Sequence, residues 1–187
     1  QNKKSLNKIN NFILKKKIII EIIVHNLGGS LGHKDPFSDS NIWKKVWDFN
    51  LGISIDINNL IIPFMKKSGW GRIIHISSNA TSINIGNSPY IAAKGALESY
   101  VKSVSKHLSK FNVIMNCISP GLVNLEGRFY TKLKNNNYKE FKKYIDSNIP
   151  IGRMCETNEI SSVVTFLCSV HSSYMSGSIV KVDGIGN

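Results

Sequence analysis

Four short runs rich in β-branched and other apolar residues recur along the chain, separated by segments of helical length. The runs cover residues 18–24, 71–78, 113–118 and 178–182. Runs of this length, bounded by glycine, proline or serine, are typical of buried parallel strands. Between them, apolar residues recur three or four positions apart, as they do in amphipathic helices. The alternation predicts an α/β fold of the Rossmann-like, doubly wound kind, with helices on both faces of a parallel sheet.

The helical segments and one long polar segment complete this outline. We expect helices over residues 5–16, from about 38–40 to 67, from 88 to about 108, and over 158–168. Asn50 lies inside the second helix, where asparagine is unfavourable, so its amide is either solvated or has a specific role. Pro63 is expected to kink that helix near its end. Residues 122–150 are polar and aromatic, and predict a mobile excursion with one or two short helices that acts as a lid.

Length and composition indicate one soluble globular domain spanning residues 1–187. Apolar residues make up 42% of the chain and the mean hydropathy is −0.09, which is typical of a folded domain rather than a disordered one. The net charge of +12 invites comparison with nucleic-acid-binding proteins. The lysines, however, are scattered along the chain and there are only three arginines. Nucleic-acid binding is therefore a minor hypothesis.

The three cysteines, Cys117, Cys155 and Cys168, are widely spaced and odd in number. This spacing fits free thiols in a reducing compartment better than disulfides, and it lacks the close pairs of a zinc site. The chain shows no signal-peptide pattern, and its longest apolar run is too short to span a bilayer. These features predict a cytoplasmic protein. Because the chain opens on Gln1 with material typical of a domain interior, we expect it to be a fragment that lacks an N-terminal part.

The segment from Ser88 to Lys94 has the strongest chemical pattern. Ser88 is expected to cap a helix and Pro89 to occupy its first position, which places Tyr90 in the first turn. Lys94 follows four residues later, so the phenol and the ammonium share one face of the helix. A fixed cation favours the phenolate, and lowering the pKa of Tyr90 to about 7 would need roughly 4 kcal/mol. Taken alone, the motif is more often a surface Tyr–Lys pair.

Parallel sheets bind ligands beyond the carboxyl ends of their strands, and several polar or glycine-bearing features are expected there. These are residues 26–29, Ser77 and Ser78, the start of the helix bearing Tyr90, and Pro120 with Gly121. Ser78 can bond a substrate oxygen, Tyr90 can transfer a proton to it, and Lys94 can stabilise the phenolate. None of these groups can supply two electrons, so carbonyl–alcohol chemistry at this edge needs a hydride carrier.

Two other motif assignments fail on spacing. Gly28, Gly29 and Gly32 do not form G-x-G-x-x-G, and no helix follows them, so they are not a dinucleotide fingerprint. A serine hydrolase is the natural alternative, but no serine lies in a G-x-S-x-G elbow and no histidine follows a strand in a suitable loop.

From about residue 5 to its end, the sequence resembles the short-chain dehydrogenase/reductase family, and within it the 3-oxoacyl-(acyl-carrier-protein) reductase-like group. Ser78 stands twelve residues before Tyr90, and Tyr90-x-x-x-Lys94 is the family signature. The other motifs follow in order: Asn26-Leu27-Gly28 for N-A-G, Asn50 within its helix, Pro120-Gly121 after a strand, and Asp183-Gly184 for the closing V-D-G. Each motif is weak alone, and together they are specific.

The resemblance implies a role for each of these residues. Tyr90 would be the general acid/base, Ser78 would position the carbonyl, and Lys94 would also bind the nicotinamide ribose. Asn50 would hold a water molecule that relays protons to solvent. The remaining contacts with NAD or NADP would come from Asn26 and Gly28 on the adenosine–ribose side and from Pro120, Gly121 and Val123 at the nicotinamide. Residues 122–150 would form the substrate loop. The helices bearing Asn50 and Tyr90 would build a homodimer or homotetramer.

The chain departs from the family pattern in several places. The glycine-rich T-G-x-x-x-G-x-G turn, and the residue that selects NAD or NADP, should lie upstream of Gln1. Leu27, Leu125 and Ile185 replace the usual alanine, threonine and second glycine of their motifs. We therefore interpret the chain as the C-terminal portion of an NAD(P)-dependent oxidoreductase that interconverts a carbonyl and a secondary alcohol. The alternative is a non-catalytic remnant that acts as a dimerisation scaffold. The substrate and the reaction direction stay open.

Overall fold

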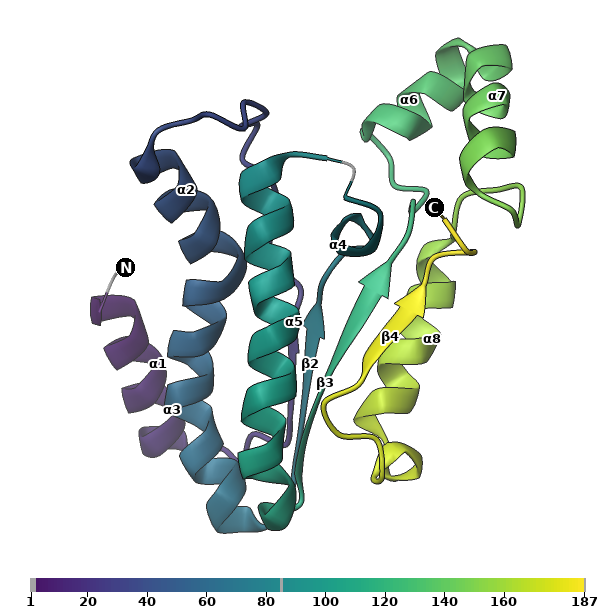
Figure 1. Ribbon diagram of the computed structural model, residues 1–187. Coiled ribbons are helices and arrows are strands. Elements are labelled where there is room, and N and C mark those ends of the chain that lie inside the picture. The colour runs from purple at the N-terminus through teal and green to yellow at the C-terminus, as the bar shows by residue number, and fades with distance from the viewer. Residues whose placement is uncertain (1–2, 85, 187) are drawn as a thin grey trace.

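The computed structural model describes residues 3–84 and 86–186, and its centre is a parallel sheet (Figure 1). Four strands lie in the order β1 (Ile22–His25), β2 (Gly71–Ile76), β3 (Val113–Pro120) and β4 (Ile179–Val182). Each neighbouring pair is parallel, so all carboxyl ends meet at one edge. The predicted α/β fold with a parallel sheet is confirmed.

Helices connect the strands as the sequence pattern predicts. The elements are α1 (Lys3–Lys16), α2 (Ser40–Trp47), the π-helix η1 (Asp48–Gly52), α3 (Ile53–Ser68), α4 (Ala80–Ile83), α5 (Ser88–Leu108), the short 3-10 helix η2 (Ser109–Phe111), α6 (Phe129–Asn136), α7 (Tyr138–Asn148), α8 (Thr157–Cys168) and the 3-10 helix η3 (Val170–Ser172). The turn between β2 and α5 contains the single-turn helix α4.

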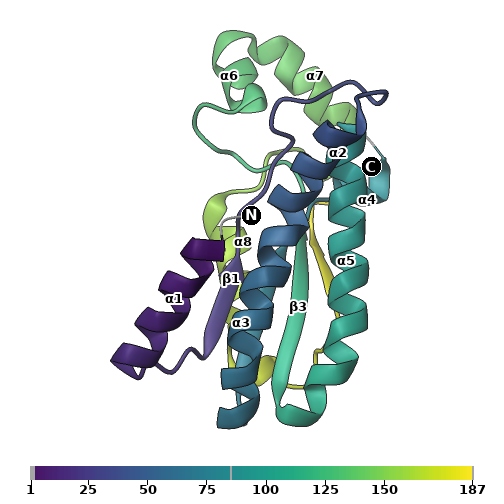
Figure 2. The ribbon, with the colours of Figure 1, turned by 90° about the vertical axis from the view of Figure 1, so that its left-hand side faces the viewer.

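The sheet is covered on both faces, and the pleat decides what each face buries. Helices α3 and α5 lie on one face with α1 beside α3, while α8 lies on the other (Figure 2). Because successive side chains of a strand point to opposite faces, Ile73 of β2 packs toward α3 and α5 whereas Ile74 packs toward α8. His75 and Ile76 continue the same alternation toward the carboxyl edge.

The long helix expected up to residue 67 is interrupted. Helix α2 runs into the π-helical turn η1, which contains Asn50, and α3 begins immediately after it. Inserted π-helical turns are rare and occur frequently at functional sites. Pro63 lies within α3, which continues beyond it to Ser68.

The prediction of a buried strand over residues 18–24 is wrong in extent and in burial. The strand covers only Ile22–His25 and lies at an edge of the sheet. Ile22 and Val24 are 46% and 42% exposed, and Val24 lines a cavity shared with residues of α8. His25, which points toward α3, is buried.

Helix α5 begins as expected, but with a different capping residue. Its N-cap is Asn87, in an extended conformation, so Ser88 is already helical. Pro89 lies in the first turn, where its missing N–H has no intrahelical acceptor. The helix thus begins one residue earlier than predicted, and Tyr90 and Lys94 still share one face of it.

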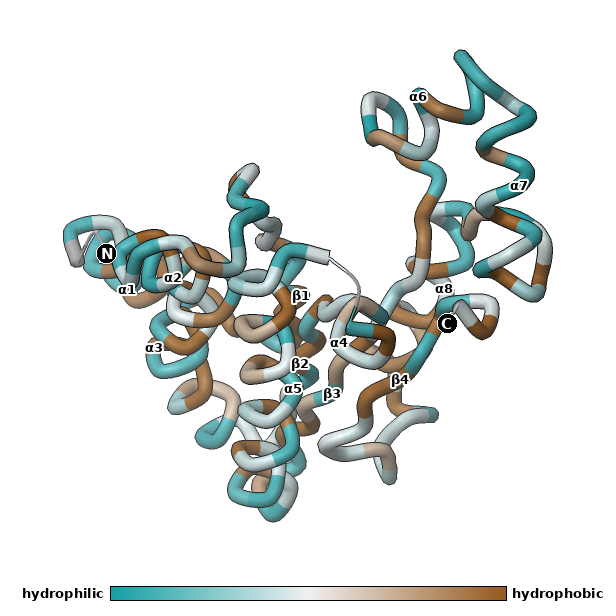
Figure 3. The backbone as a smooth tube through the Cα atoms, turned by 45° about the horizontal axis from the view of Figure 1, so that its top comes forward, coloured by the Kyte–Doolittle hydropathy of each residue, from teal (hydrophilic) through white to brown (hydrophobic). Residues whose placement is uncertain are grey.

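The excursion predicted at residues 122–150 forms two short helices, α6 and α7, which stand beyond the carboxyl edge of the sheet (Figures 1 and 3). It has its own apolar cluster around Phe141, Ile145, Ile149 and Met154. Within the described ranges, no helix is both long and apolar enough to cross a membrane.

Candidate active site

The carboxyl ends of β2 and β3 bring the predicted residues together. The Ser77 N–H donates to the Ile118 carbonyl at 2.7 Å, and the Asn79 N–H donates to the Pro120 carbonyl at 2.9 Å. This pairing aligns Ser78 beside Pro120. A cleft of about 490 Å³ opens here, and its lining includes Gly28, Ser78, Tyr90, Pro120, Gly121 and Val123.

Ser78 presents its hydroxyl to this cleft. Its Oγ accepts a hydrogen bond from the Ala80 N–H at 3.3 Å, at the start of α4. A serine hydroxyl has one proton to donate, and this contact uses only an acceptor site. The Ser78 proton is therefore available to a group in the cleft, which Tyr90 also lines and where the Ser78 side chain interacts with the phenol.

Tyr90 is partly buried, and its electrostatics differ from the prediction. Burial raises the pKa of Tyr90 above 10, while the Ser78 hydroxyl and the charge of Arg128 oppose that rise. The expected net lowering of this pKa is not observed, because burial outweighs the groups that favour the phenolate. The Lys94 ammonium lies 5.9 Å from the centroid of the Tyr90 ring, and its hydrogen bond goes elsewhere. Tyr90 is thus a protonated phenol at neutral pH.

Lys94 is buried behind the cleft and is 3% exposed. Its Nζ donates to the Ile76 carbonyl at 2.6 Å, at the end of β2. Burial lowers the pKa of Lys94 to about 8, and the neighbouring Cys117 and Glu98 partly offset this. A lysine with this pKa is mostly charged at neutral pH and loses its charge in mildly alkaline solution.

Asn50 has a specific structural role, which answers the question that the sequence left open. Its Oδ1 accepts from the Gly29 N–H at 2.9 Å, and its Nδ2 donates to the Gly29 carbonyl and to the Val46 carbonyl, both at 2.8 Å. The side chain is 1% exposed. It therefore fastens the turn after β1 to the π-helical turn of the long helix.

Gly28 is required where this turn meets Lys94. A Cβ at Gly28 would lie 2.7 Å from Asn50 Oδ1 and 2.8 Å from Lys94 Nζ, both closer than real Cβ contacts. Only glycine lets the backbone approach the two groups so closely. The region predicted from the N-A-G resemblance is thus in contact with the predicted lysine and asparagine.

Three predicted residues, Asn26, Asn50 and Lys94, do not line the main cleft, and Asn26 lies furthest toward α8. It lines a neighbouring cavity of about 410 Å³ on the α8 side, together with Val24, Ile76 and residues of α8. Pro120 and Val123 line both cavities. The predicted set thus spans two adjoining cavities, with Asn50 and Lys94 behind them.

The sequence did not single out several polar residues near the site. Arg128, at the start of α6, lines the cleft and interacts with Tyr90. Glu98, one turn after Lys94 on α5, accepts hydrogen bonds from Ser77 and Thr81. The spacing of Glu98 from Lys94 was visible, but its partners come from another segment of the chain.

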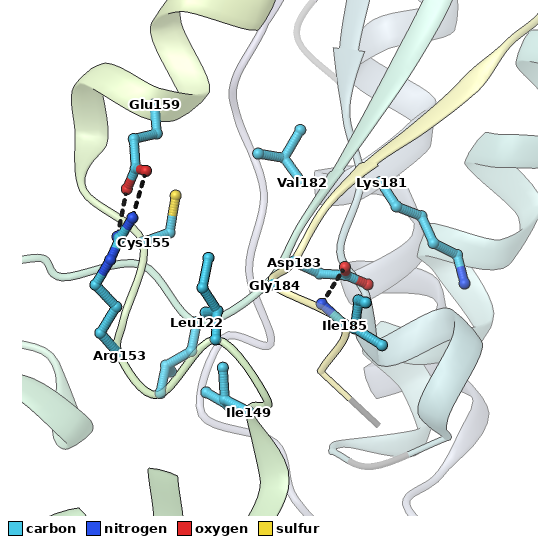
Figure 4. A pocket seen from close by; sticks show the side chains of 11 residues that line it. Leu122, Ile149, Arg153, Cys155, Glu159, Lys181, Val182, Asp183, Gly184 and Ile185 are labelled. Carbon is cyan, nitrogen blue, oxygen red and sulfur yellow. Dashed lines mark hydrogen bonds and ion pairs between the residues drawn. The ribbon is translucent and has the colours of Figure 1, made fainter. Parts of the chain in front are cut away.

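A further cavity of about 310 Å³ lies beside the C-terminal strand (Figure 4). Arg153 and Glu159 form a two-contact ion pair at its margin, at 2.7 and 2.8 Å, while Asp183 accepts from the Ile185 N–H. Neither Ser78 nor Tyr90 lines this cavity. It is separate from the predicted centre.

The chain is thus an α/β protein in which Ser78, Tyr90 and Lys94 gather at the carboxyl edge of a parallel sheet. The sequence profile of the family described as Enoyl-(Acyl carrier protein) reductase matches residues 1–184. The chain belongs to the short-chain dehydrogenase/reductase family, in agreement with the resemblance seen in its motifs.

Known relatives support this assignment. A tropinone reductase homolog of Arabidopsis thaliana is 31% identical, over 88% of this chain and 61% of its own length. The 3-oxoacyl-(acyl-carrier-protein) reductase FabG of Chlamydia trachomatis is 32% identical, over 94% of this chain and 68% of its own length. A 7α-hydroxysteroid dehydrogenase, solved with NADH and 7-oxo glycochenodeoxycholic acid, superposes with a TM-score of 0.84 at 27% identity, covering 98% of this chain and 70% of that one. The chain thus spans about three fifths of the length of the Arabidopsis relative.

Proposed function

We propose that this chain forms the catalytic portion of an NAD(P)-dependent oxidoreductase, 3-oxoacyl-(acyl-carrier-protein) reductase-like, that interconverts a carbonyl and a secondary alcohol. The observation that supports this most directly is that Ser78 and Tyr90 line one cleft, with Lys94 buried behind it on the same helix as Tyr90. Family membership and the relatives that are reductases or dehydrogenases point the same way.

The residues present fit the nicotinamide–ribose half of such a cofactor. Lys94 is a buried cation with one proton bonded to Ile76 and two further donors. The absence of a side chain at Gly28 leaves the backbone open beside it. We assign the ribose to Lys94 and Tyr90, the nicotinamide to Pro120, Gly121 and Val123, and the adenosine side to Asn26 and Gly28. The described glycines do not include a phosphate-binding turn, so the choice between NAD and NADP is left open.

The bound cofactor supplies the hydride that reaches the carbonyl carbon, and the chain's own groups handle the oxygen. Ser78 donates a hydrogen bond that holds the carbonyl oxygen in the cleft. Tyr90, protonated at neutral pH, transfers its proton to that oxygen as the hydride adds. Lys94 stabilises the phenolate that is left, and a proton from solvent restores the phenol. Oxidation runs through the same groups in reverse.

Two further elements complete the proposal. Residues 122–150, with α6 and α7, would cover the substrate, since Tyr130 and Leu122 line the cleft together with Ser78. The helices with Asn50 and Tyr90 would form the interface of a homodimer or homotetramer in the cytoplasm. Oligomeric state, compartment and the Asn50 water relay stay predictions. Both Nδ2 protons of Asn50 are already donated, so a relay water bound by this side chain would donate to Oδ1, which accepts one hydrogen bond from Gly29.

The test is a substrate panel of ketones, β-ketoacyl thioesters and keto sugars, assayed with NADH and NADPH on the full-length protein. We expect turnover with at least one pair, and we expect Tyr90→Phe to reduce kcat by about 10²–10⁴-fold while cofactor binding stays near wild type. Retained turnover in Tyr90→Phe would remove Tyr90 from the mechanism. A full-length protein that neither binds nor oxidises a nicotinamide would favour the non-catalytic scaffold.

A further inference from the structure

Glu98 ties the helix that carries Tyr90 and Lys94 to the turn that carries Ser78. Its Oε1 accepts from the Ser77 hydroxyl at 2.7 Å and from the Thr81 hydroxyl at 3.0 Å. These two donors lie on either side of Ser78, one at the end of β2 and one in α4. A single carboxylate on α5 thus holds both flanks of the serine.

The turn depends on this carboxylate for partners. The Ser77 side chain is buried, and its hydroxyl proton is donated to Glu98. The Thr81 hydroxyl lies within reach of Glu98 and also of the Ser78 carbonyl, at 2.9 Å, so its one proton is shared between them. Without Glu98, a buried hydroxyl would lose its acceptor and the turn would be free to move.

Glu98 also supplies negative charge beside Lys94. The two residues are four positions apart on α5 and share one face. Burial is the larger influence and lowers the pKa of Lys94, whereas Cys117 of β3 and Glu98 raise it. The other titratable groups that interact with this cluster are Tyr90 on α5 and His75 on β2. Among these named groups, only Glu98 is a carboxylate, so its negative charge favours the Lys94 ammonium.

We propose that Glu98 is a positioning residue for the reaction, which orients Ser78 through Ser77 and Thr81 and maintains the positive charge of Lys94. This inference rests on the proposed function and extends it to a residue that touches neither substrate nor cofactor. Glu98 would act in two ways, by hydrogen bonding and by its charge. Different substitutions at this position can distinguish the two.

Glu98→Gln keeps the acceptor and removes the charge, whereas Glu98→Ala removes both. In Glu98→Gln we expect the alkaline limb of the kcat profile to move to lower pH, with kcat at pH 6.5 near wild type. In Glu98→Ala we expect the same displacement and, in addition, a loss in kcat of about tenfold to a hundredfold at every pH, because the serine is no longer fixed. Glu21→Gln is the matched control, since it removes the same charge from an exposed position on the chain.

A second readout does not require turnover. In uniformly ¹³C-labelled protein without cofactor, the Lys94 Cε resonance, assigned by its loss in Lys94→Arg, reports the titration of that ammonium. We expect its midpoint, near pH 8 in the wild type, to fall in Glu98→Gln and to stay unchanged in Glu21→Gln. Thr81→Val, which keeps the charge, should leave the midpoint unchanged and lower kcat.

An unmoved Lys94 midpoint in Glu98→Gln, or wild-type kcat in Glu98→Ala, would overturn the inference. If the wild-type protein reduces no carbonyl, the proposed function is overturned instead. The Lys94 titration needs no turnover, so it still tests the effect of the Glu98 charge. Thermal unfolding identifies a variant that does not fold. If Glu98→Ala is such a variant, Glu98→Gln and Thr81→Val decide the outcome.

Discussion

The two faces of the sheet have the same backbone and different chemistry. On the α8 face, Ile74, Ile118 and Leu167 form an apolar cluster that contains none of the predicted catalytic residues. On the α3 and α5 face, the carboxyl half of the sheet buries His25, His75 and Lys94. Since the pleat sends neighbouring residues to opposite faces, one strand serves both roles: Ile74 stabilises the fold and His75 joins a polar network.

The polar network on the α5 face is organised around Asn58 of α3. Asn58 Oδ1 lies 2.8 Å from His25 Nε2, and Asn58 Nδ2 lies 3.3 Å from His75 Nε2 and 3.0 Å from the Tyr100 hydroxyl. The rings of His25 and His75 stack with centroids 4.5 Å apart. The α8 face also buries polar side chains, Arg72 and Asn116, but these donate to backbone carbonyls away from the proposed centre. The difference between the faces is therefore the network of histidine and amide side chains that the α5 face buries near that centre.

The largest effect should follow from removing the buried cation of the polar face. Lys94→Ala is expected to lower kcat by about 10²–10³-fold, because the developing phenolate loses its positive partner. Steady-state kinetics on the full-length protein measure this. Lys102→Ala, on the exposed side of the same helix, should have no effect. Equal losses in both variants would contradict the assigned role.

Leu167→Ala should destabilise the packing on the apolar face without changing the catalytic activity. Leu167 is fully buried, so we expect its truncation to reduce the free energy of unfolding by about 2–5 kcal/mol. The activity of each folded molecule should be retained. Chemical denaturation combined with an activity assay in the native baseline separates these outcomes. A variant that is stable but inactive would mean that this face does take part in function.

Asn58→Ala should destabilise the polar face by a smaller amount, about 1–3 kcal/mol. The substitution leaves His25, His75 and the Tyr100 hydroxyl without their shared partner in a region with little access to water. Denaturant unfolding measures the change. Asn59→Ala is the matched control, because the neighbouring side chain is exposed. An equal effect in both variants would show that the network adds no net stability.

The smallest effect is a dependence of stability on pH that belongs to the polar face. Burial lowers the pKa of His75 well below 6.5, and burial lowers the pKa of His25 as well. Below pH 6.5 the unfolded chain therefore binds protons that the folded chain does not. Stability should be complete above pH 6.5 and should decline as the pH falls below that value. In His75→Asn, the decline in the unfolding temperature should be shallower, and an identical slope would exclude His75 as its source.

Much of the fold was predictable because it is encoded locally. The β-branched runs and the helical periodicity located the four strands and the main helices of the described residues, and the excursion, expected to carry one or two short helices, has two. The misassignments arose where contacts with other segments decide the local structure. Strand β1 is short and exposed at an edge of the sheet, and Asn87 rather than Ser88 caps α5. The π-helical turn at Asn50 has no clear local pattern, since it is stabilised by hydrogen bonds to Gly29 from a distant segment.

The site, like the fold, was predictable from the sequence only in part. Ser78, Tyr90 and Lys94 could be found from spacing, because parallel strands bring their carboxyl ends to one edge. The protonation of Tyr90 could not, since the pKa of a phenol depends on burial and on which group the neighbouring ammonium actually contacts. Glu98 was missed because its partners, Ser77 and Thr81, are 21 and 17 residues away.

By itself, the sequence determined the order of strands and helices along the chain, the family and the side chains proposed to react, because these follow from periodicity and from motifs a few residues long. The tertiary structure decided which face of the sheet each polar group occupies, which hydrogen bonds Lys94 and Asn50 make, and which protons are in place. Those properties depend on burial and on contacts between distant segments, which exist only once the chain has folded.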